Sequence, residues 1–438
     1  MAHKIISGFS KLNRQQKIQL LIQQLKLDES TASFLNSFEL TDSEWQSVIS
    51  ELSENQLSNF HLPFSVAPNF LIDEKLMVLP LVTEESSVVA ALAKAAGFWA
   101  KHGGFHTEIT GTEKKGQVHF NWKGNPEQLK YLFPKIKKKL LKEVDPFIKN
   151  MKKRGGGIND IHLNYLPEIL PAYYQLDVSF ETCDAMGANF INSCLEQLGK
   201  SLKNFIQKSE HLKKEAQDLE VIMAILSNHI PDSRVKVWVK CPVSELNENR
   251  EQAQAFAEKF VRAVHIARHD VSRAVTHNKG IFNGIDALAI ATGNDYRAIE
   301  AGGHAFAARD GQYKGLSEAK LENGNFWFGL EVPLAVGVVG GVTTLHPMAK
   351  LAIRILKNPS AKQLMAYLAV AGLASNWSAI SALVTTGIQK GHMKMHLGNI
   401  LNSFSLSDEQ KQALKLYFQN REVSFPEVQK YLDEHAGS

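Results

Sequence analysis

Residues 272–298 of this 438-residue chain read SRAVTHNKGIFNGIDALAIATGNDYRA. This stretch places Lys279 and Asp295 on either side of an apolar segment. Its glycines and asparagines favour turns, so we predict a helix over 252–275 followed by a turn-rich region that carries Lys279. A buried lysine needs a partner carboxylate. Lys279 and Asp295 are therefore expected to pair, either as a structural ion pair or within a reactive site.

The flanking sequence predicts a mixture of strands and helices. β-Branched and alternating segments indicate strands, and apolar residues at helical spacing indicate helices. The predicted strands lie within 61–85, near 105–110, near 116–122, once after residue 157, and over 221–228 and 234–240. The predicted helices lie over 12–26, 86–104, 130–154, from residue 185 onward, over 252–275 and beyond residue 407.

The composition is that of an ordinary globular protein. Of the 438 residues, 44% are hydrophobic and 21% are charged, which excludes a disordered, collagen-like or disulfide-stapled chain. The 49 Lys and Arg residues exceed the 45 Asp and Glu residues by 4, too few to predict nucleic-acid binding. Three cysteines and a polar N-terminal start predict a cytoplasmic protein with no secretory signal.

One uncharged stretch is a candidate for a membrane span. Residues 364–389 carry no charge and are long enough to cross a bilayer. Polar side chains interrupt the stretch, with Ser375 and Asn376 near its middle. The sequence therefore favours two buried core helices, broken near Asn376, over a transmembrane helix. No membrane partner is predicted.

A basic segment over 130–154 holds ten Lys and Arg residues against Glu143 and Asp145. Its apolar residues recur at helical spacing. Three interpretations stay open: the solvated face of an amphipathic helix, a surface for the phosphates of a nucleotide-like ligand, or a nucleic-acid surface.

Several common catalytic motifs are absent. The sequence has no G-x-G-x-x-G and no G-x-S-x-G, and the P-loop-like spacing of Gly111 and Gly116 fails because Gln117 follows. His392 and His396 have the spacing of zinc ligands on a helix, but no third ligand is evident. No metal is predicted.

Three further segments set polar residues in apolar surroundings. In Thr83–Ser87, a carboxylate either caps the following helix or has a pKa raised by burial, which would let it donate a proton. The small residues of 184–189 either pack a helix N-terminus or leave its N–H groups open to an anion. His392, which follows Gly391, either packs or caps the chain or acts in catalysis.

One family has the same segments in the same order and spacing: EESSVVAAL, DAMGAN, SRAVTHNKGIFNGID, ATGNDYRA and GIQKGHM. Over about residues 50–400 the chain resembles 3-hydroxy-3-methylglutaryl-coenzyme A reductase of the soluble bacterial class, class II. The resemblance implies reduction of hydroxymethylglutaryl-CoA to mevalonate and CoA by two hydride transfers, through mevaldyl-CoA and mevaldehyde, or the reverse. It therefore implies a place in the mevalonate pathway of isoprenoid biosynthesis.

The resemblance also implies roles for individual residues. The family's catalytic residues match Glu85, Lys279, Asp295 and His392. The residues that hold the hydroxymethylglutaryl group match Ser87, Asn228, Arg273 and Asn283. The dinucleotide-binding segment matches Asp184, Met186, Gly187 and Asn189.

The residue types suit these implied roles. Hydride addition to a thioester makes an oxyanion, which Lys279 can stabilise. A thiol has a reference pKa of roughly 8.5, so His392 can protonate a departing CoA thiolate at neutral pH. Glu85 can supply a proton to the second alkoxide, directly or through Lys279, while Asp295 holds Lys279 charged. The Arg273 guanidinium can bind a carboxylate through two hydrogen bonds.

The choice between NADH and NADPH stays open. Asp145, shortly before the GGG segment, can accept a hydrogen bond from a ribose 2′-OH and so favour NADH. Nearby basic residues can instead bind a 2′-phosphate: Lys149, Lys152, Lys153 and Arg154. The basic excess favours NADPH slightly.

The fold implied by the resemblance is mixed α/β. A large substrate-binding and dimerisation domain is expected over 1–110 and 221–375, with a small, ferredoxin-like, non-Rossmann dinucleotide domain inserted over 111–220. A C-terminal helical flap is expected over 376–438. The implied assembly is a homodimer, or a set of dimers, with active sites at the subunit interface.

The chain departs from the family pattern near its N-terminus. Members carry Glu-Asn-Val-Ile-Gly at a contact with substrate or CoA, whereas Glu54–Ser58 reads ENQLS here, which puts that contact in doubt. Ser86 stands where proline is frequent. The alternative function is a catalytically inactive paralogue that binds CoA thioesters, and the complete set of four catalytic residues argues against it.

Overall fold

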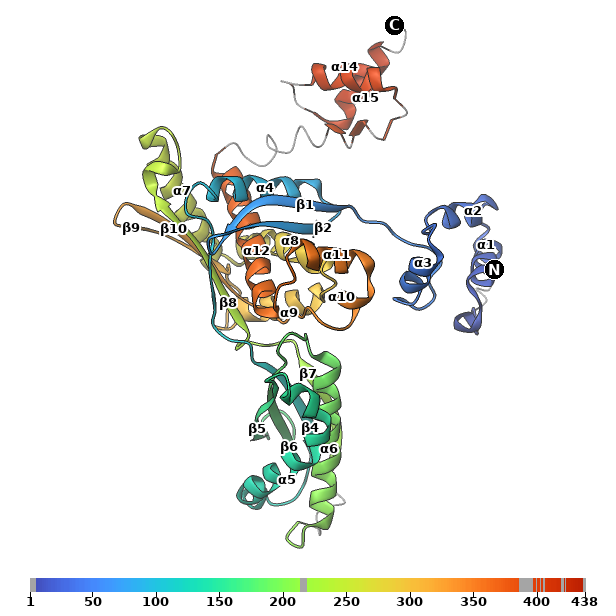
Figure 1. Cartoon of the computed structure of the whole chain (residues 1–438), viewed down its shortest axis with the longest axis vertical. Helices are drawn as coiled ribbons and strands as arrows, with labels where there is room; N and C mark the ends of the chain where they lie inside the picture. The colour runs from blue at the N-terminus through green and yellow to red at the C-terminus, as the bar shows by residue number, and fades with distance from the viewer. Residues whose placement is uncertain are drawn as a thin grey trace.

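The computed structural model describes residues 5–212, 219–385, 397–398, 400–401, 403–404, 406–418, 421 and 423–435. Its described residues form a mixed α/β fold with three sheets and three hydrophobic cores. In Figure 1 a central body carries the N-terminal helices on one side and a small α/β unit below it. The N-terminal helices are η1 (Phe9–Lys11), α1 (Arg14–Leu25), α2 (Ser30–Ser37) and α3 (Ser43–Ser50).

The central body is built from a strand hairpin, a four-stranded sheet and the helices packed on them. The hairpin pairs β1 (Phe64–Ile72) with β2 (Lys75–Val82). The sheet has the order β3–β8–β10–β9, with strands His106–Ile109, Arg234–Pro242, Asn325–Pro333 and Ser317–Glu322. The helices are α4 (Ser86–Trp99), η3 (Val243–Glu245), α7 (Arg250–His269), α8 (Val271–Ala291), α9 (Tyr296–Ala307), α10 (Val342–Leu345), α11 (Pro347–Ile355) and α12 (Ala361–Val384).

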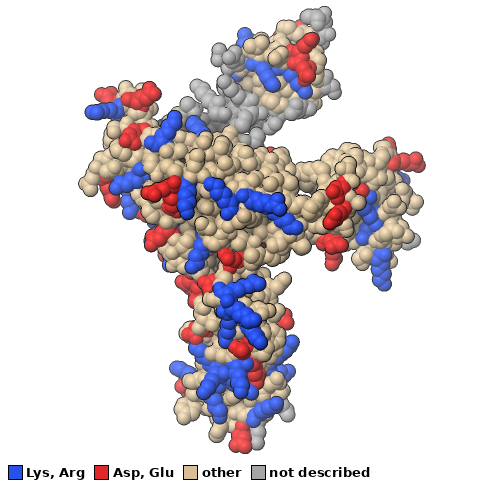
Figure 2. All heavy atoms as spheres, viewed as in Figure 1, with Lys and Arg blue, Asp and Glu red and all other residues tan. Residues whose placement is uncertain are grey.

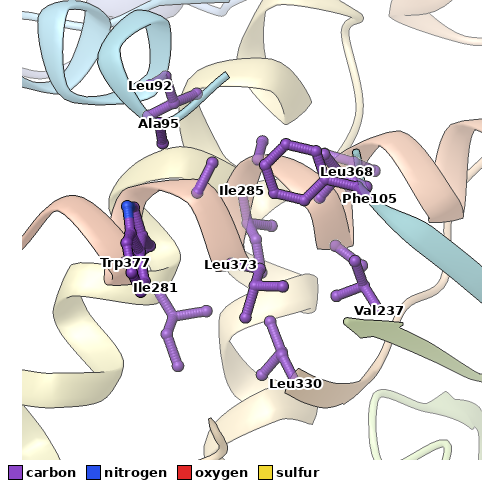
Figure 3. Close-up of a cluster of buried hydrophobic side chains, with 14 of the residues drawn as sticks. Leu92, Ala95, Phe105, Val237, Ile281, Ile285, Leu330, Leu368, Leu373 and Trp377 are labelled. Atoms are coloured by element: carbon purple, nitrogen blue, oxygen red, sulfur yellow. The ribbon is translucent and has the colours of Figure 1, made fainter. Parts of the chain in front are cut away.

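Helix α12 runs through the middle of this body, and its apolar side chains meet α4, α8 and the sheet (Figure 3). The backbones of α8 and α12 come into direct contact, because a Cβ atom at Gly284 would lie 2.2 Å from the carbonyl oxygen of Ala371. Gly284 therefore serves a helix crossing and does not make a turn, whereas Gly293, with a φ of 69°, lies in the turn that follows α8.

The sequence predicted two helices in the uncharged stretch 364–389, broken near Asn376. This break is wrong, because α12 is one continuous helix. The two polar side chains at the predicted break have partners: Ser375 Oγ donates to Gly280 O at 2.7 Å, and Ser317 Oγ donates to Asn376 Oδ1 at 2.9 Å. In the described part of the chain, α12 alone has the length and composition to cross a membrane. Its most apolar window is 72% buried, as in a core helix.

The prediction of a turn-rich region around Lys279 is also wrong. The predicted helix over 252–275 is in fact two helices, because α7 ends at His269 and α8 then continues to Ala291. Asp270 caps the second helix by accepting a hydrogen bond from Arg273 N at 2.7 Å. Lys279 thus lies in the middle of a helix.

The small unit has the element order β4 (Lys114–Asn121), α5 (Pro126–Lys152), β5 (Gly157–Tyr165), β6 (Tyr173–Glu181), α6 (Ala188–Lys208) and β7 (Glu220–Ser227). Its sheet has the order β5–β6–β4–β7, and every pairing is antiparallel. This is the ferredoxin-like split arrangement and not the parallel Rossmann sheet. Two strands follow the GGG segment where one was predicted.

Two C-terminal helices, α14 (Asp408–Tyr417) and α15 (Phe425–His435), enclose the third core. The Ser407 side chain and Gln410 form a reciprocal capping box at the start of α14. The predicted division into domains over 1–110 with 221–375, 111–220 and 376–438 stays a prediction. The last of these boundaries falls inside α12.

Candidate active site

A lysine and a glutamate from distant segments meet at the start of α4. Lys279 Nζ on α8 lies 3.3 Å from Glu85 Oε2, and Ser87 Oγ donates to Glu85 Oε1 at 2.6 Å. Glu85 is the N-cap residue of α4, but its side chain makes no capping hydrogen bond. The capping interpretation of this carboxylate is therefore wrong, and its two oxygens are used by the serine and the lysine.

The predicted ion pair between Lys279 and Asp295 is not formed in this single chain. Asp295 caps α9 instead, where its Oδ1 accepts from Ala298 N at 3.2 Å and lies 3.5 Å from Arg297 Nε. The lysine is not buried either, because its side chain is 64% exposed and that of Glu85 is 42% exposed. The pair lies at an open surface of the described chain.

Helix α8 is anchored directly before its exposed lysine. His277 and Asn278 are 1% and 0% exposed. Asn278 Nδ2 donates to Lys314 O and its Oδ1 accepts from Leu316 N, both at 2.9 Å. Lys279 therefore projects from a segment whose neighbouring side chains are fixed in the core.

The His277 ring is held in its neutral form. Its Nε2 lies 2.6 Å from Ser317 Oγ. The Ser317 hydroxyl donates its one proton to Asn376 Oδ1, so His277 Nε2 is protonated and donates to Ser317 Oγ. Burial, with the nearby Arg273 charge, lowers the pKa of His277 to about 3. Sequence reasoning missed this network, whose one visible signal was Ser375 and Asn376 in an apolar stretch.

The four predicted substrate residues are not all brought together. Ser87 contacts the Glu85 carboxylate, and Asn283 lies four residues after Lys279, on the same helix face. Arg273 is partly buried, which lowers its pKa. Asn228 follows β7, where its carbonyl oxygen lies 2.7 Å from the position of a Cβ at Gly302. Within the described residues, no hydrogen bond joins these last three side chains to Glu85.

The predicted dinucleotide segment lies where the small unit meets the central body. Gly187, with a φ of 94°, is the N-cap of this 21-residue helix and has no side chain that could cap it, so among the described residues the first N–H groups of α6 stay open to an anion. Asp184 Oδ1 accepts from Ala361 N at 2.8 Å. A Cβ at Gly337 would lie 2.3 Å from Met186 N, so the two units touch through backbone, while Asn189 is exposed.

The basic helix α5 is amphipathic. Six of its apolar residues are buried against the small core: Leu129, Ile136, Leu140, Val144, Ile148 and Met151. Figure 2 shows Lys and Arg side chains gathered over this lower unit. Asp145 is exposed and accepts a hydrogen bond from Lys152 Nζ at 2.5 Å.

Two predicted features lie outside this arrangement. His392 and His396 fall outside the described residues. In the part of the chain that the structure describes, no group of three or more His, Cys, Asp or Glu residues is placed to hold a metal ion. The Glu54–Ser58 segment is tied to the N-terminal helices, because Leu57 O accepts from Arg14 Nε at 2.8 Å and Ser58 Oγ donates to Leu35 O at 2.5 Å.

This mixed α/β fold brings one carboxylate into contact with both a lysine and a serine, a set of groups that can carry out acid–base chemistry. Residues 13–397 match the family model described as Hydroxymethylglutaryl-coenzyme A reductase. Over 400 residues the chain is 34% identical to 3-hydroxy-3-methylglutaryl-coenzyme A reductase of Archaeoglobus fulgidus, covering 90% of this chain and 86% of the relative. A probable reductase of Borreliella burgdorferi is 31% identical over 374 residues, covering 84% of this chain and 83% of the relative.

Solved structures agree with these sequence matches. A 3-hydroxy-3-methylglutaryl-coenzyme A reductase from Streptococcus pneumoniae superposes with a TM-score of 0.73 at 35% identity, covering 98% of this chain and 99% of that one. A class II reductase from the same organism, bound to NADPH in open conformations, gives 0.72 at 36% identity, covering 86% and 99%. The chain belongs to the hydroxymethylglutaryl-coenzyme A reductase family, which confirms the resemblance of its motifs.

Proposed function

We propose that this protein reduces hydroxymethylglutaryl-CoA to mevalonate and CoA by two successive hydride transfers, through mevaldyl-CoA and mevaldehyde. The observation that carries the proposal is the contact of Lys279, Glu85 and Ser87 in a member of this family. These three residues come from two of the motif segments and supply a cation, a carboxyl group and a hydroxyl at one point. Carbonyl reduction needs these groups, because each hydride addition leaves a negative oxygen.

The side chains divide this work. The Lys279 ammonium stabilises negative charge on the substrate oxygen, and Glu85, 3.3 Å away, can pass it a proton. Ser87 fixes the other carboxylate oxygen. In the family pattern Asp295 also supports the lysine, and His392 protonates the CoA thiolate. Arg273, Asn228 and Asn283 are assigned to the hydroxymethylglutaryl group.

The residues at the start of α6 fit a dinucleotide. A bound nicotinamide dinucleotide supplies the hydride. The uncapped N-terminus at Gly187 offers N–H groups to its phosphates. We favour NADPH over NADH, because the Asp145 carboxylate is already bonded to Lys152, while Arg154 lies beside the segment, with its carbonyl oxygen 3.2 Å from Cys183 Sγ.

The open position of the pair supports a homodimer, or an assembly of dimers, in which a second subunit covers the site. A single chain leaves the Lys279 side chain 64% exposed, whereas charge stabilisation is strongest where water is excluded. A cytoplasmic location and the absence of nucleic-acid or membrane partners stay predictions.

An absorbance assay tests the proposed reaction. Purified protein is mixed with hydroxymethylglutaryl-CoA and either NADPH or NADH, and loss of reduced nicotinamide is followed beside release of free thiol. We expect two nicotinamides consumed per thiol and a faster rate with NADPH. No consumption with either cofactor, from a folded protein that still binds CoA thioesters, would favour the inactive paralogue.

A further inference from the structure

A buried lysine lies where the small unit meets the central body. Lys114 opens strand β4 and is only 6% exposed. It lines a small cavity together with residues of the central body, among them Ser233, Leu334 and Lys362. Neither the reaction nor the motif set assigns this side chain a role.

The Lys114 ammonium holds the turn that precedes α6. Its Nζ donates to Thr182 Oγ1 and, at 2.9 Å, to Ala185 O. Thr182 Oγ1 donates to the same carbonyl oxygen at 2.7 Å. Thr182 is fully buried and packs under Gly187, where a Cβ would lie 2.5 Å from its methyl group. This three-way contact fixes residues 182–187, the entry to α6.

No carboxylate forms an ion pair with Lys114 among the described residues. Glu181 accepts from Cys183 N at 2.7 Å, and Asp184 accepts from Ala361 N at 2.8 Å. A buried cation without a directly paired anion is unfavourable, and burial lowers the pKa of Lys114 to about 8, although the nearby Glu181 charge acts in the opposite direction. A cation that no carboxylate pairs with directly, beside an open helix N-terminus, is a favourable electrostatic setting for a bound anion.

We propose that Lys114 is a positioning residue of the nicotinamide dinucleotide site, where it fixes the 182–187 turn and adds positive charge beside the α6 N-terminus. The inference rests on the proposed function, because it requires this segment to bind the dinucleotide. Lys114 acts through Thr182 and Ala185, so its loss weakens cofactor binding and leaves the hydroxymethylglutaryl site unchanged.

The role makes cofactor affinity depend on pH. With its pKa lowered to about 8 by burial, Lys114 is expected to lose its proton between pH 7 and pH 9 in the free protein, and an anion binds the charged form better. The dissociation constant is therefore expected to rise about tenfold between pH 7 and pH 9. The other titratable groups facing Lys114 are Glu181, Cys183, Asp184 and Lys362. Of these groups, Cys183 has a thiol whose pKa is raised by burial.

Fluorescence titration of the full-length protein with NADPH, at pH 7 and at pH 9, tests the proposal. The phosphate monoester of NADPH has a pKa of about 6, so this phosphate stays ionised between pH 7 and pH 9. Lys114→Met should raise the dissociation constant about tenfold at pH 7 and abolish the further rise at pH 9. Lys114→Arg, which cannot deprotonate, should bind as the wild type does at pH 7 and also lose the rise. Lys115→Met is the matched control, because Lys115 pairs with Asp232.

The variants separate the possible outcomes. A Lys114→Met protein that binds within about twofold of the wild type, or keeps its pH dependence, overturns the inference alone. If that variant does not fold, Lys114→Arg decides, and its retention of the wild-type pH dependence overturns the inference. A wild-type protein that binds neither NADPH nor NADH contradicts the proposed function as well. KM for hydroxymethylglutaryl-CoA should stay unchanged in Lys114→Arg and in the control.

Discussion

Lys279 Nζ lies 3.3 Å from Oε2 of Glu85, a residue 194 positions earlier in the chain. The other oxygen of the same carboxylate accepts a hydrogen bond from Ser87 at 2.6 Å. The serine leaves the carboxylate little freedom to rotate, so the lysine and glutamate face one another in a defined geometry. The proposed proton transfers depend on this geometry.

Ser87→Ala should slow the reductase reaction. The change removes the hydrogen bond to Glu85 Oε1, and a hydrogen bond to a charged group contributes about 1.5–3 kcal/mol. We expect kcat/KM for hydroxymethylglutaryl-CoA to fall by roughly 10- to 100-fold. Ser378→Ala, which removes a hydroxyl bonded to Ala91 O at 2.7 Å, is the control and should stay near wild type. Equal rates in both variants would refute the positioning role of Ser87.

His392→Ala should separate the two halves of the reaction. A protonating group for the CoA thiolate is needed only when the thioester is cleaved. The variant should therefore reduce hydroxymethylglutaryl-CoA slowly, by roughly 100-fold or more, and reduce added mevaldehyde at close to the wild-type rate. Steady-state rates with each substrate give the answer. Equal loss with both substrates would show that the assigned role of His392 is wrong.

The buried His277 should make the folded state sensitive to acid. Its pKa is about 3 in the fold and about 6.5 in an unfolded chain, so the unfolded state binds the extra proton as pH falls below 6.5. The free energy of unfolding should therefore drop by about 1.4 kcal/mol from this group between pH 7.5 and 5.5.

Urea denaturation at the two pH values measures this difference. The His277→Gln variant should lose this pH-dependent drop in the free energy of unfolding. The His265→Gln variant should keep it, because His265 lies on the exposed face of α7. An acid sensitivity that is the same in both variants would show that His277 is not its source.

Arg154 should favour NADPH over NADH. It lies beside the dinucleotide segment, where its positive charge acts on the Cys183 thiol, while Asp145 is bonded to Lys152. Arg154→Gln should raise KM for NADPH by about tenfold and leave KM for NADH nearly unchanged. Asp145→Ala should change the ratio of kcat/KM for NADPH to kcat/KM for NADH less than Arg154→Gln does. A ratio that responds only to Asp145 would assign cofactor choice to that carboxylate.

Residues from two of the motif segments lie together in the structure, while their assigned roles stay predictions. Glu85, Ser87 and Lys279 are in contact, although 194 positions separate the first from the last. No spacing rule predicts that contact, although the family resemblance singled out both of the segments that form it. The ferredoxin-like order of the small unit was also implied by the resemblance and is confirmed by its strand order.

The local predictions failed where tertiary contacts override residue propensity. Gly284 and Asn278 favour turns in isolation, but they lie inside α8, where one permits the close crossing of α12 and the other bonds to backbone groups. Asn376 leaves α12 unbroken because Ser317 satisfies it. Lys114 carried no sequence signal, because its importance comes from burial beside residues about seventy positions away.

The central claim is that Lys279 and Glu85 act as one unit in reduction. It is tested most directly by the rates of mevaldehyde reduction for Lys279→Met, Glu85→Gln and the double variant. Each single variant should lose roughly 1,000-fold in kcat. The double variant should be no slower than the slower single variant, because removing either partner already disables the pair. Losses that multiply in the double variant, or a single variant that keeps its activity, would contradict the account.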